Sequence, residues 1–133
     1  MGALSSLEQS TIERAAAEPM LDQVLAWAAI NSGSRNLAGL ERVAEALAGE
    51  FATLPGDLSL REAAPVEAVD PKGATYEIAQ GRNLHLKVRP DAPVQLLFTG
   101  HMDTVFGEDH PFQQTSWVEV SVLGGPGVAD MKG

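Results

Sequence analysis

Apolar residues recur with helical spacing in two segments of the N-terminal half. In residues 5–30 one face is formed by Leu21, Val24, Leu25 and Ala28. Pro19 lies inside this segment and lacks a backbone N–H, so we predict that the helix breaks near Glu18. In residues 37–54 a second stripe is formed by Leu40, Val43, Leu47 and Phe51. The turn formers of residues 55–57 then end this helix.

The middle of the chain changes to the period of a β-strand. Residues 58–63 (LSLREA), 74–80 (ATYEIAQ) and 83–90 (NLHLKVRP) are strand candidates, as is 117–124 (WVEVSVLG). Residues 94–100, VQLLFTG, differ because they form a continuous apolar run. Such a run is typical of a strand buried on both faces of a sheet that helices cover.

Helices followed by strands, with one strand that is fully buried, predict an α/β fold. We expect the helices to pack on a mixed sheet in which residues 94–99 are the buried central strand. The chemistry of the chain should then lie just after this strand, because ligand sites in α/β sheets open at the carboxyl ends of the strands.

Composition and charge exclude several kinds of partner and metal ligand. The 133 residues carry a net charge of -9, which disfavours nucleic acid and anionic membrane as partners because both attract basic surfaces. No cysteine is present, so any metal would be held by imidazole and carboxylate groups. No apolar run approaches the roughly 20 residues of a membrane span, and the N-terminus lacks a secretory pattern. We therefore expect a cytoplasmic protein.

His101 and Asp103 follow the predicted central strand directly. An imidazole at this position suits a zinc ion, and a carboxylate two residues later could accept the second ring N–H and orient the histidine. The alternative is an ordinary surface turn, since two-residue motifs recur by chance. The other histidines have no such setting: we expect His85 to be an exposed strand residue and His110 a loop residue.

Asp130 lies in a second candidate stretch, GGPGVADMKG, which covers residues 124–133. Its glycines allow the backbone to approach a compact site closely. The alternative is a flexible loop with a solvated aspartate and lysine.

Together the two stretches resemble a known family of enzymes. GHMDTV, followed about 30 residues later by GPGVADMKG, is similar in order and spacing to the dizinc metallopeptidases that include glutamate carboxypeptidases, aminoacylases, acetylornithine deacetylases and succinyl-diaminopimelate desuccinylases. The helices, the SGSRN loop and the strands that precede the histidine also fit. Within the family, HMDTVF and GPGVAD are most similar to the glutamate carboxypeptidase branch.

The resemblance implies a set of roles. His101 would bind one zinc ion, Asp130 would bridge two zinc ions, and Asp103 would be the catalytic-site residue that orients His101. Cobalt or manganese would be substitutes for zinc. The peptide bond after the bridging aspartate, Asp130–Met131, would often be cis. The substrate would be a small N-acyl amino acid or peptide, cleaved at an amide bond next to a free carboxylate.

The family's general base, its other metal ligands and its dimerisation domain have no counterpart in this sequence. We therefore expect residues 1–133 to be the N-terminal part of a zinc-exopeptidase-like catalytic domain, with homodimerisation through the domain that is absent. By itself the chain should not hydrolyse amides, because two ligands hold zinc weakly and a positioned base typically contributes about 10²–10⁴-fold. The alternative is a binding or regulatory module that keeps the fold without catalysis. A third interpretation is an unrelated α/β domain in which both motifs are coincidental.

Overall fold

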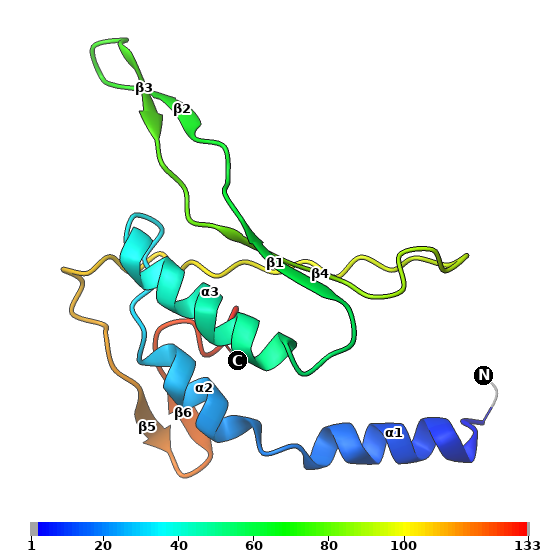
Figure 1. Cartoon of the computed structure of the whole chain (residues 1–133). Coiled ribbons are helices and arrows are strands. Elements are labelled where there is room, and N and C mark those ends of the chain that lie inside the picture. The colour runs from blue at the N-terminus through cyan, green and yellow to red at the C-terminus, as the bar shows by residue number, and fades with distance from the viewer. Residues whose placement is uncertain (1–2, 133) are drawn as a thin grey trace.

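The chain forms three helices and six short strands in a computed structural model that describes residues 3–132 (Figure 1). The helices are α1 (Ser6–Ala17), α2 (Met20–Ala28) and α3 (Leu37–Phe51). The strands are β1 (Asp57–Arg61), β2 (Val66–Val69), β3 (Thr75–Ile78), β4 (Asn83–Lys87), β5 (Ser116–Glu119) and β6 (Val122–Gly124).

The break that Pro19 predicts in the first helical segment is confirmed. α1 ends at Ala17, and α2 begins at Met20 directly after the proline. A capping box at Ser5 and Glu8 starts α1, but none of the residues of this helix is buried. Figure 1 shows α1 extending to one side of the molecule. Its stability must therefore come from local interactions.

The buried apolar side chains belong to α2 and α3. They are Ala28, Leu40, Val43 and Ala44. α3 packs against β1 and β4, which pair antiparallel with Leu58 opposite Leu86 and Leu60 opposite Leu84. Arg82, just before β4, forms an ion pair with Glu41 of α3. This unit of one helix packed on a two-stranded sheet is the centre of the fold.

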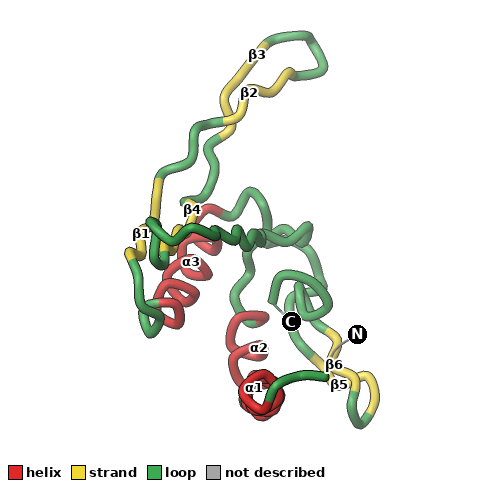
Figure 2. The backbone as a smooth tube through the Cα atoms, turned by 90° about the vertical axis from the view of Figure 1, so that its right-hand side faces the viewer, coloured by secondary structure: helices red, strands yellow, loops and turns green. Residues whose placement is uncertain are grey.

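The described residues form three separate two-stranded sheets, each of them antiparallel. β2 and β3 make a hairpin that projects away from the helices (Figures 1 and 2). β1, β3 and β4 confirm three of the predicted strands, whereas β2 was not predicted. The segment 117–124 is a β5–β6 hairpin rather than a single strand, because the chain turns at Val120 and Ser121.

The prediction that residues 94–99 form a buried central strand is wrong. This segment is irregular, and within the described part of the chain residues 94–100 form no backbone hydrogen bond. The side chains of Val94, Leu96, Leu97 and Phe98 are between 75% and 89% exposed. A central strand needs a partner on each edge, and residues 3–132 supply none. The expected mixed sheet is therefore absent from them, although the combination of helices and strands is broadly α/β.

No helix formed by residues 3–132 is both long and apolar enough to cross a membrane.

Candidate metal centre

The candidate site is built where two loops distant in sequence meet. Gly33 and Thr104 form an isolated parallel bridge, in which the Thr104 amide donates to the Ser32 carbonyl at 2.8 Å and the Ser34 amide donates to the Thr104 carbonyl at 3.1 Å. A Cβ atom at position 33 would lie only 2.6 Å from the Phe106 carbonyl oxygen. Glycine at this position is therefore needed for the close approach that holds the His101 segment in place.

Asn31 also connects the 31–36 loop to the loop that follows His101 through side-chain hydrogen bonds. Its amide nitrogen lies 3.2 Å from the Phe106 carbonyl oxygen and 2.7 Å from Oε1 of Gln113. Its Oδ1 accepts hydrogen bonds from the Gly33 amide at 3.1 Å and from the Asn36 side chain at 2.9 Å. One side chain thus connects the end of α2, the start of α3 and the loop after His101.

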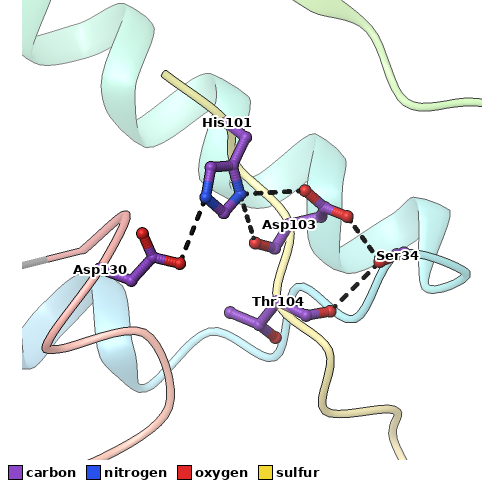
Figure 3. Close-up of polar contacts among 5 residues, drawn as sticks. All are labelled: Ser34, His101, Asp103, Thr104 and Asp130. Carbon is purple, nitrogen blue, oxygen red and sulfur yellow. Dashed lines mark hydrogen bonds and ion pairs between the residues drawn. The ribbon is translucent and has the colours of Figure 1, made fainter.

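Asp103 lies at one nitrogen of the His101 ring (Figure 3). Nδ1 of His101 is 2.9 Å from the backbone oxygen of Asp103 and 3.1 Å from its Oδ1. The other carboxylate oxygen, Oδ2, accepts a hydrogen bond from the Ser34 hydroxyl at 2.5 Å. The histidine is thereby connected through Asp103 to the 31–36 loop.

Asp130 faces the opposite nitrogen of the same ring (Figure 3). Its Oδ2 lies 3.3 Å from Nε2 of His101. The 125–132 segment is held by three turns, in which Gly127, with a φ of 79°, accepts hydrogen bonds from the amides of Asp130 and Lys132. A left-handed φ of this kind favours glycine, so Gly127 lets the chain curl back toward His101.

Lys132 connects the 125–132 segment to the end of α2. Its side chain is 2% exposed, and Nζ donates to the Ile30 carbonyl at the end of α2 at 2.7 Å. Burial lowers the pKa of Lys132 because it disfavours the charged ammonium. Within residues 3–132 this lysine forms no ion pair, so its contribution is the hydrogen bond and the packing of its methylene groups.

The three site residues line an open pocket of about 320 Å³. Phe106 and Phe112, whose ring centroids are 4.9 Å apart, contribute apolar surface to this pocket, and Gly125 and Gly127 also line it. The side chains of His101 and Asp130 are 54% and 72% exposed, so both are accessible to an entering ligand.

The carboxylates alter the protonation of His101. Burial alone would lower the pKa of the imidazole, but the hydrogen bonds that Asp103 accepts from the ring and the negative charge of Asp130 outweigh it and raise the pKa. The pKa of Asp103 is lowered, first by the hydrogen bond from Ser34 and also by His101, against an opposing effect of burial. Asp103 is therefore held as a carboxylate, the form that accepts hydrogen bonds.

The structure brings together all three residues that the sequence singled out. The expected proximity of His101, Asp103 and Asp130 is found, whereas their roles in metal binding and catalysis stay predictions. No cluster of three or more His, Asp or Glu side chains suited to a metal occurs in the described residues. The Asp130–Met131 peptide is not cis, since no cis bond is found in the described chain.

The remaining histidines lie apart from this ring. His85 is in β4 opposite Ser59, and it is half-buried rather than exposed as expected. His110 is a loop residue, as expected; its ring lies against Phe106 in a tilted arrangement, with the centroids 4.9 Å apart, and its Nδ1 accepts a hydrogen bond from the Phe112 amide.

Sequence reasoning missed Ser34, Asn31 and Lys132 as parts of the site. The SGSRN loop was noted as part of the family resemblance, whereas side chains of residues 31–36 act across gaps of 69 to 82 residues. No local pattern encodes such pairings. From the residues themselves the signal was weak: a polar, turn-forming segment precedes an amphipathic helix, which is typical of many loops.

Comparisons of the chain with protein-family models, with curated proteins and with solved structures found no match.

Proposed function

We propose that this chain contributes a histidine and an aspartate to the zinc centre of an amidohydrolase or exopeptidase, of the kind that cleaves an amide next to a free carboxylate. Asp103 orients the histidine. The observation that supports this proposal best is the separation of 3.3 Å between Nε2 of His101 and Oδ2 of Asp130.

This separation suits two ligands of one metal ion. With zinc bonds of about 2.0–2.1 Å to nitrogen and about 2.0–2.2 Å to oxygen, two corners of a tetrahedron lie roughly 3.4 Å apart. A charge-assisted N–H···O bond would be shorter, at about 2.7–2.9 Å. The pair therefore fits a shared cation better than a direct ion pair.

The protonation of the imidazole also bears on this pair. A neutral ring has one N–H, yet oxygen atoms lie close to both of its nitrogens. If the proton is on Nδ1, facing Asp103, the lone pair of Nε2 faces a carboxylate. A second positive centre must then lie between Nε2 and Asp130, either a proton on the ring or a metal ion.

The chain's own residues would hold and orient this centre. His101 and Asp130 would bind zinc, which lowers the pKa of a bound water to about 7 and polarises a carbonyl. Asp103 would keep the proton of the imidazole on Nδ1. Phe106 and Phe112 would offer an apolar surface to the substrate beside the metal ligands.

Two protein ligands are fewer than the three that a catalytic zinc normally has. We propose that the other ligands and the general base come from residues outside this chain. The second candidate, a binding or regulatory module without catalysis, is favoured for the chain on its own because no third metal-binding side chain joins the pair among residues 3–132.

The first experiment measures zinc binding to the purified chain by competition with a chromophoric chelator. His101→Ala and Asp130→Asn should each weaken binding more than about tenfold, because loss of a mere outer partner of a ligand already costs about 10–100-fold. The matched controls His85→Ala, in β4, and Asp91→Asn, in an exposed turn, should leave the affinity unchanged. Equal affinities for all four variants would refute the site.

A second experiment separates the two candidate functions. N-acyl amino acids and glutamate conjugates are added to the zinc-loaded chain, and both binding and hydrolysis are followed. Binding without turnover is expected of the chain alone. Turnover that is lost in His101→Ala would show that the residues present are sufficient for catalysis.

A further inference from the structure

Ser34 makes the shortest polar contact of the candidate site, although it is not one of the proposed ligands. Its hydroxyl lies 2.5 Å from Oδ2 of Asp103 and 3.3 Å from the Thr104 carbonyl oxygen (Figure 3). A separation of about 2.5–2.7 Å is typical of a hydroxyl that donates to an ionised carboxylate. The single hydroxyl proton therefore goes to Asp103.

The position of this hydroxyl is fixed by the backbone. The Ser34 amide donates to the Thr104 carbonyl, and the Thr104 amide donates to the Ser32 carbonyl, so both neighbours of Gly33 are tied to the residue after Asp103. Ser34 is also partly buried. Its contact with Asp103 is thus supported by backbone hydrogen bonds on both sides of Gly33.

This contact gives the two carboxylate oxygens of Asp103 different partners. Oδ2 is held by Ser34, and this leaves Oδ1 at 3.1 Å from Nδ1 of His101. The terminal torsion of an aspartate is broad and has no strong preference of its own. Without the hydroxyl, the carboxylate could turn and the imidazole would lose one of the two oxygens that face its Nδ1.

We propose that Ser34 is a positioning residue that acts through Asp103 to keep the His101 proton on Nδ1 and to turn Nε2 toward Asp130. The significance of this role for zinc rests on the proposed function. The role itself, the control of a tautomer, concerns only residues of this chain.

The experiment compares Ser34→Ala with Ser32→Ala in the complete chain. Ser32 is a suitable control because it lies in the same loop and its buried hydroxyl has no hydrogen-bond partner among the described residues. The ring ¹⁵N shifts of His101 are recorded by long-range NMR without metal, at a pH at which the imidazole is neutral. The zinc affinity of each variant is then measured separately.

We expect the Nδ1–H tautomer to dominate in the wild type and in Ser32→Ala, and a mixture of tautomers in Ser34→Ala. Zinc affinity should fall by up to about tenfold in Ser34→Ala, less than for a direct partner of the ligand. Ser34→Thr, which keeps the hydroxyl, should restore both values. If Ser34→Ala does not fold, Ser34→Cys replaces it, because a thiol of similar size is a weak donor.

Unchanged ring shifts in a folded Ser34→Ala or Ser34→Cys variant would overturn the proposal, and unchanged shifts in Asp103→Ala would show that Asp103 does not transmit the effect. The tautomer measurement needs no metal. A wild-type chain that fails to bind zinc would thus count against the proposed function, while the ring shifts would still decide the role of Ser34.

Discussion

Two segments separated by a single residue differ sharply in their contacts with the rest of the fold. Residues 101–107 are apolar only in part, yet they are held by the bridge at Gly33, by Asn31 and by Ser34. Residues 94–99 contain four large apolar side chains, yet their backbone is unpaired and these side chains face solvent. Hydrophobicity alone does not order a segment; it needs a surface to cover or a strand to pair with.

The largest effect that we expect is self-association of the chain through the exposed residues 94–99. Residues 94–99, VQLLFT, have no charge, glycine or proline, and an exposed apolar segment with unpaired backbone groups is prone to form strand pairs with another copy. We expect the chain to associate at micromolar concentrations and Leu97→Asp to make it monomeric in analytical ultracentrifugation.

The matched control for Leu97→Asp is Leu7→Asp. Leu7 is also highly exposed, but it lies in α1, where the helix satisfies the backbone groups. If Leu7→Asp suppresses association as strongly as Leu97→Asp, then general stickiness, and not strand pairing, is the cause. A wild-type chain that remains monomeric would contradict the prediction.

Residues 101–107 should lose their ordered position when the close approach between Gly33 and Phe106 is disturbed. In Gly33→Ala the added methyl group would meet the Phe106 carbonyl oxygen at 2.6 Å, so the bridge to Thr104 must open. We expect a loss of about 1–3 kcal/mol in the free energy of unfolding, measured by urea denaturation, and weaker zinc binding.

Gly100→Ala provides the comparison for Gly33→Ala. A Cβ atom at Gly100 would meet no atom within 4 Å, although this residue directly precedes His101. Its free energy of unfolding should stay within about 1 kcal/mol of the wild type. Equal losses in the two variants would mean that the bridge does not organise the site.

Lys132→Ala tests how much the buried lysine supports the loop that holds Asp130. The variant loses the hydrogen bond to the Ile30 carbonyl and the packing of the methylene chain, so we expect destabilisation of about 1–3 kcal/mol in urea denaturation. Lys72→Ala, in the exposed β2–β3 turn, should be neutral. An unchanged stability of Lys132→Ala would show that the 125–132 loop is held by its backbone turns alone.

The smallest effect concerns α1, which has neither a buried face nor a contact with the site. Hydrogen bonds from the side chain and backbone of Ser5 lower the pKa of Glu8 in the capped helix. The stabilisation from this carboxylate is therefore present above the pKa of an unfolded glutamate and is lost as the pH falls through the lower folded value. Helicity measured by circular dichroism should decrease slightly in this acidic range.

The variant Glu8→Gln separates this effect from general acid unfolding. Glutamine can complete a capping box but does not titrate in this range. Its helicity should not show the acidic step, and the NMR signals of Ser34 and Thr104 should be unaffected by the substitution. A step of equal size in Glu8→Gln would assign the transition to other groups.

The elements that the sequence predicted correctly are those with local causes. The break at Pro19, the stripe of α3 and the alternation in β1 and β4 depend on residues a few positions apart. The same reasoning singled out His101, Asp103 and Asp130, which the structure brings together. It failed for residues 94–99, because burial depends on neighbouring strands that a run of apolar letters cannot supply. It could not identify Ser34 or Asn31, whose partners are determined by the way the loops cross.

The bridge between Gly33 and Thr104 also has a consequence for the order of folding. The β2–β3 and β5–β6 hairpins join strands that follow each other in sequence and should form within about 1–10 μs, whereas β1 and β4 pair across the whole β2–β3 hairpin. Ser34 and Asp103 are 69 residues apart, so their contact must close a far longer loop, and the entropic cost rises with loop length. The hairpins should therefore form before His101 is oriented. In a pulsed hydrogen-exchange experiment, the amide of Thr104 should gain protection later than the amides of the β2–β3 and β5–β6 hairpins.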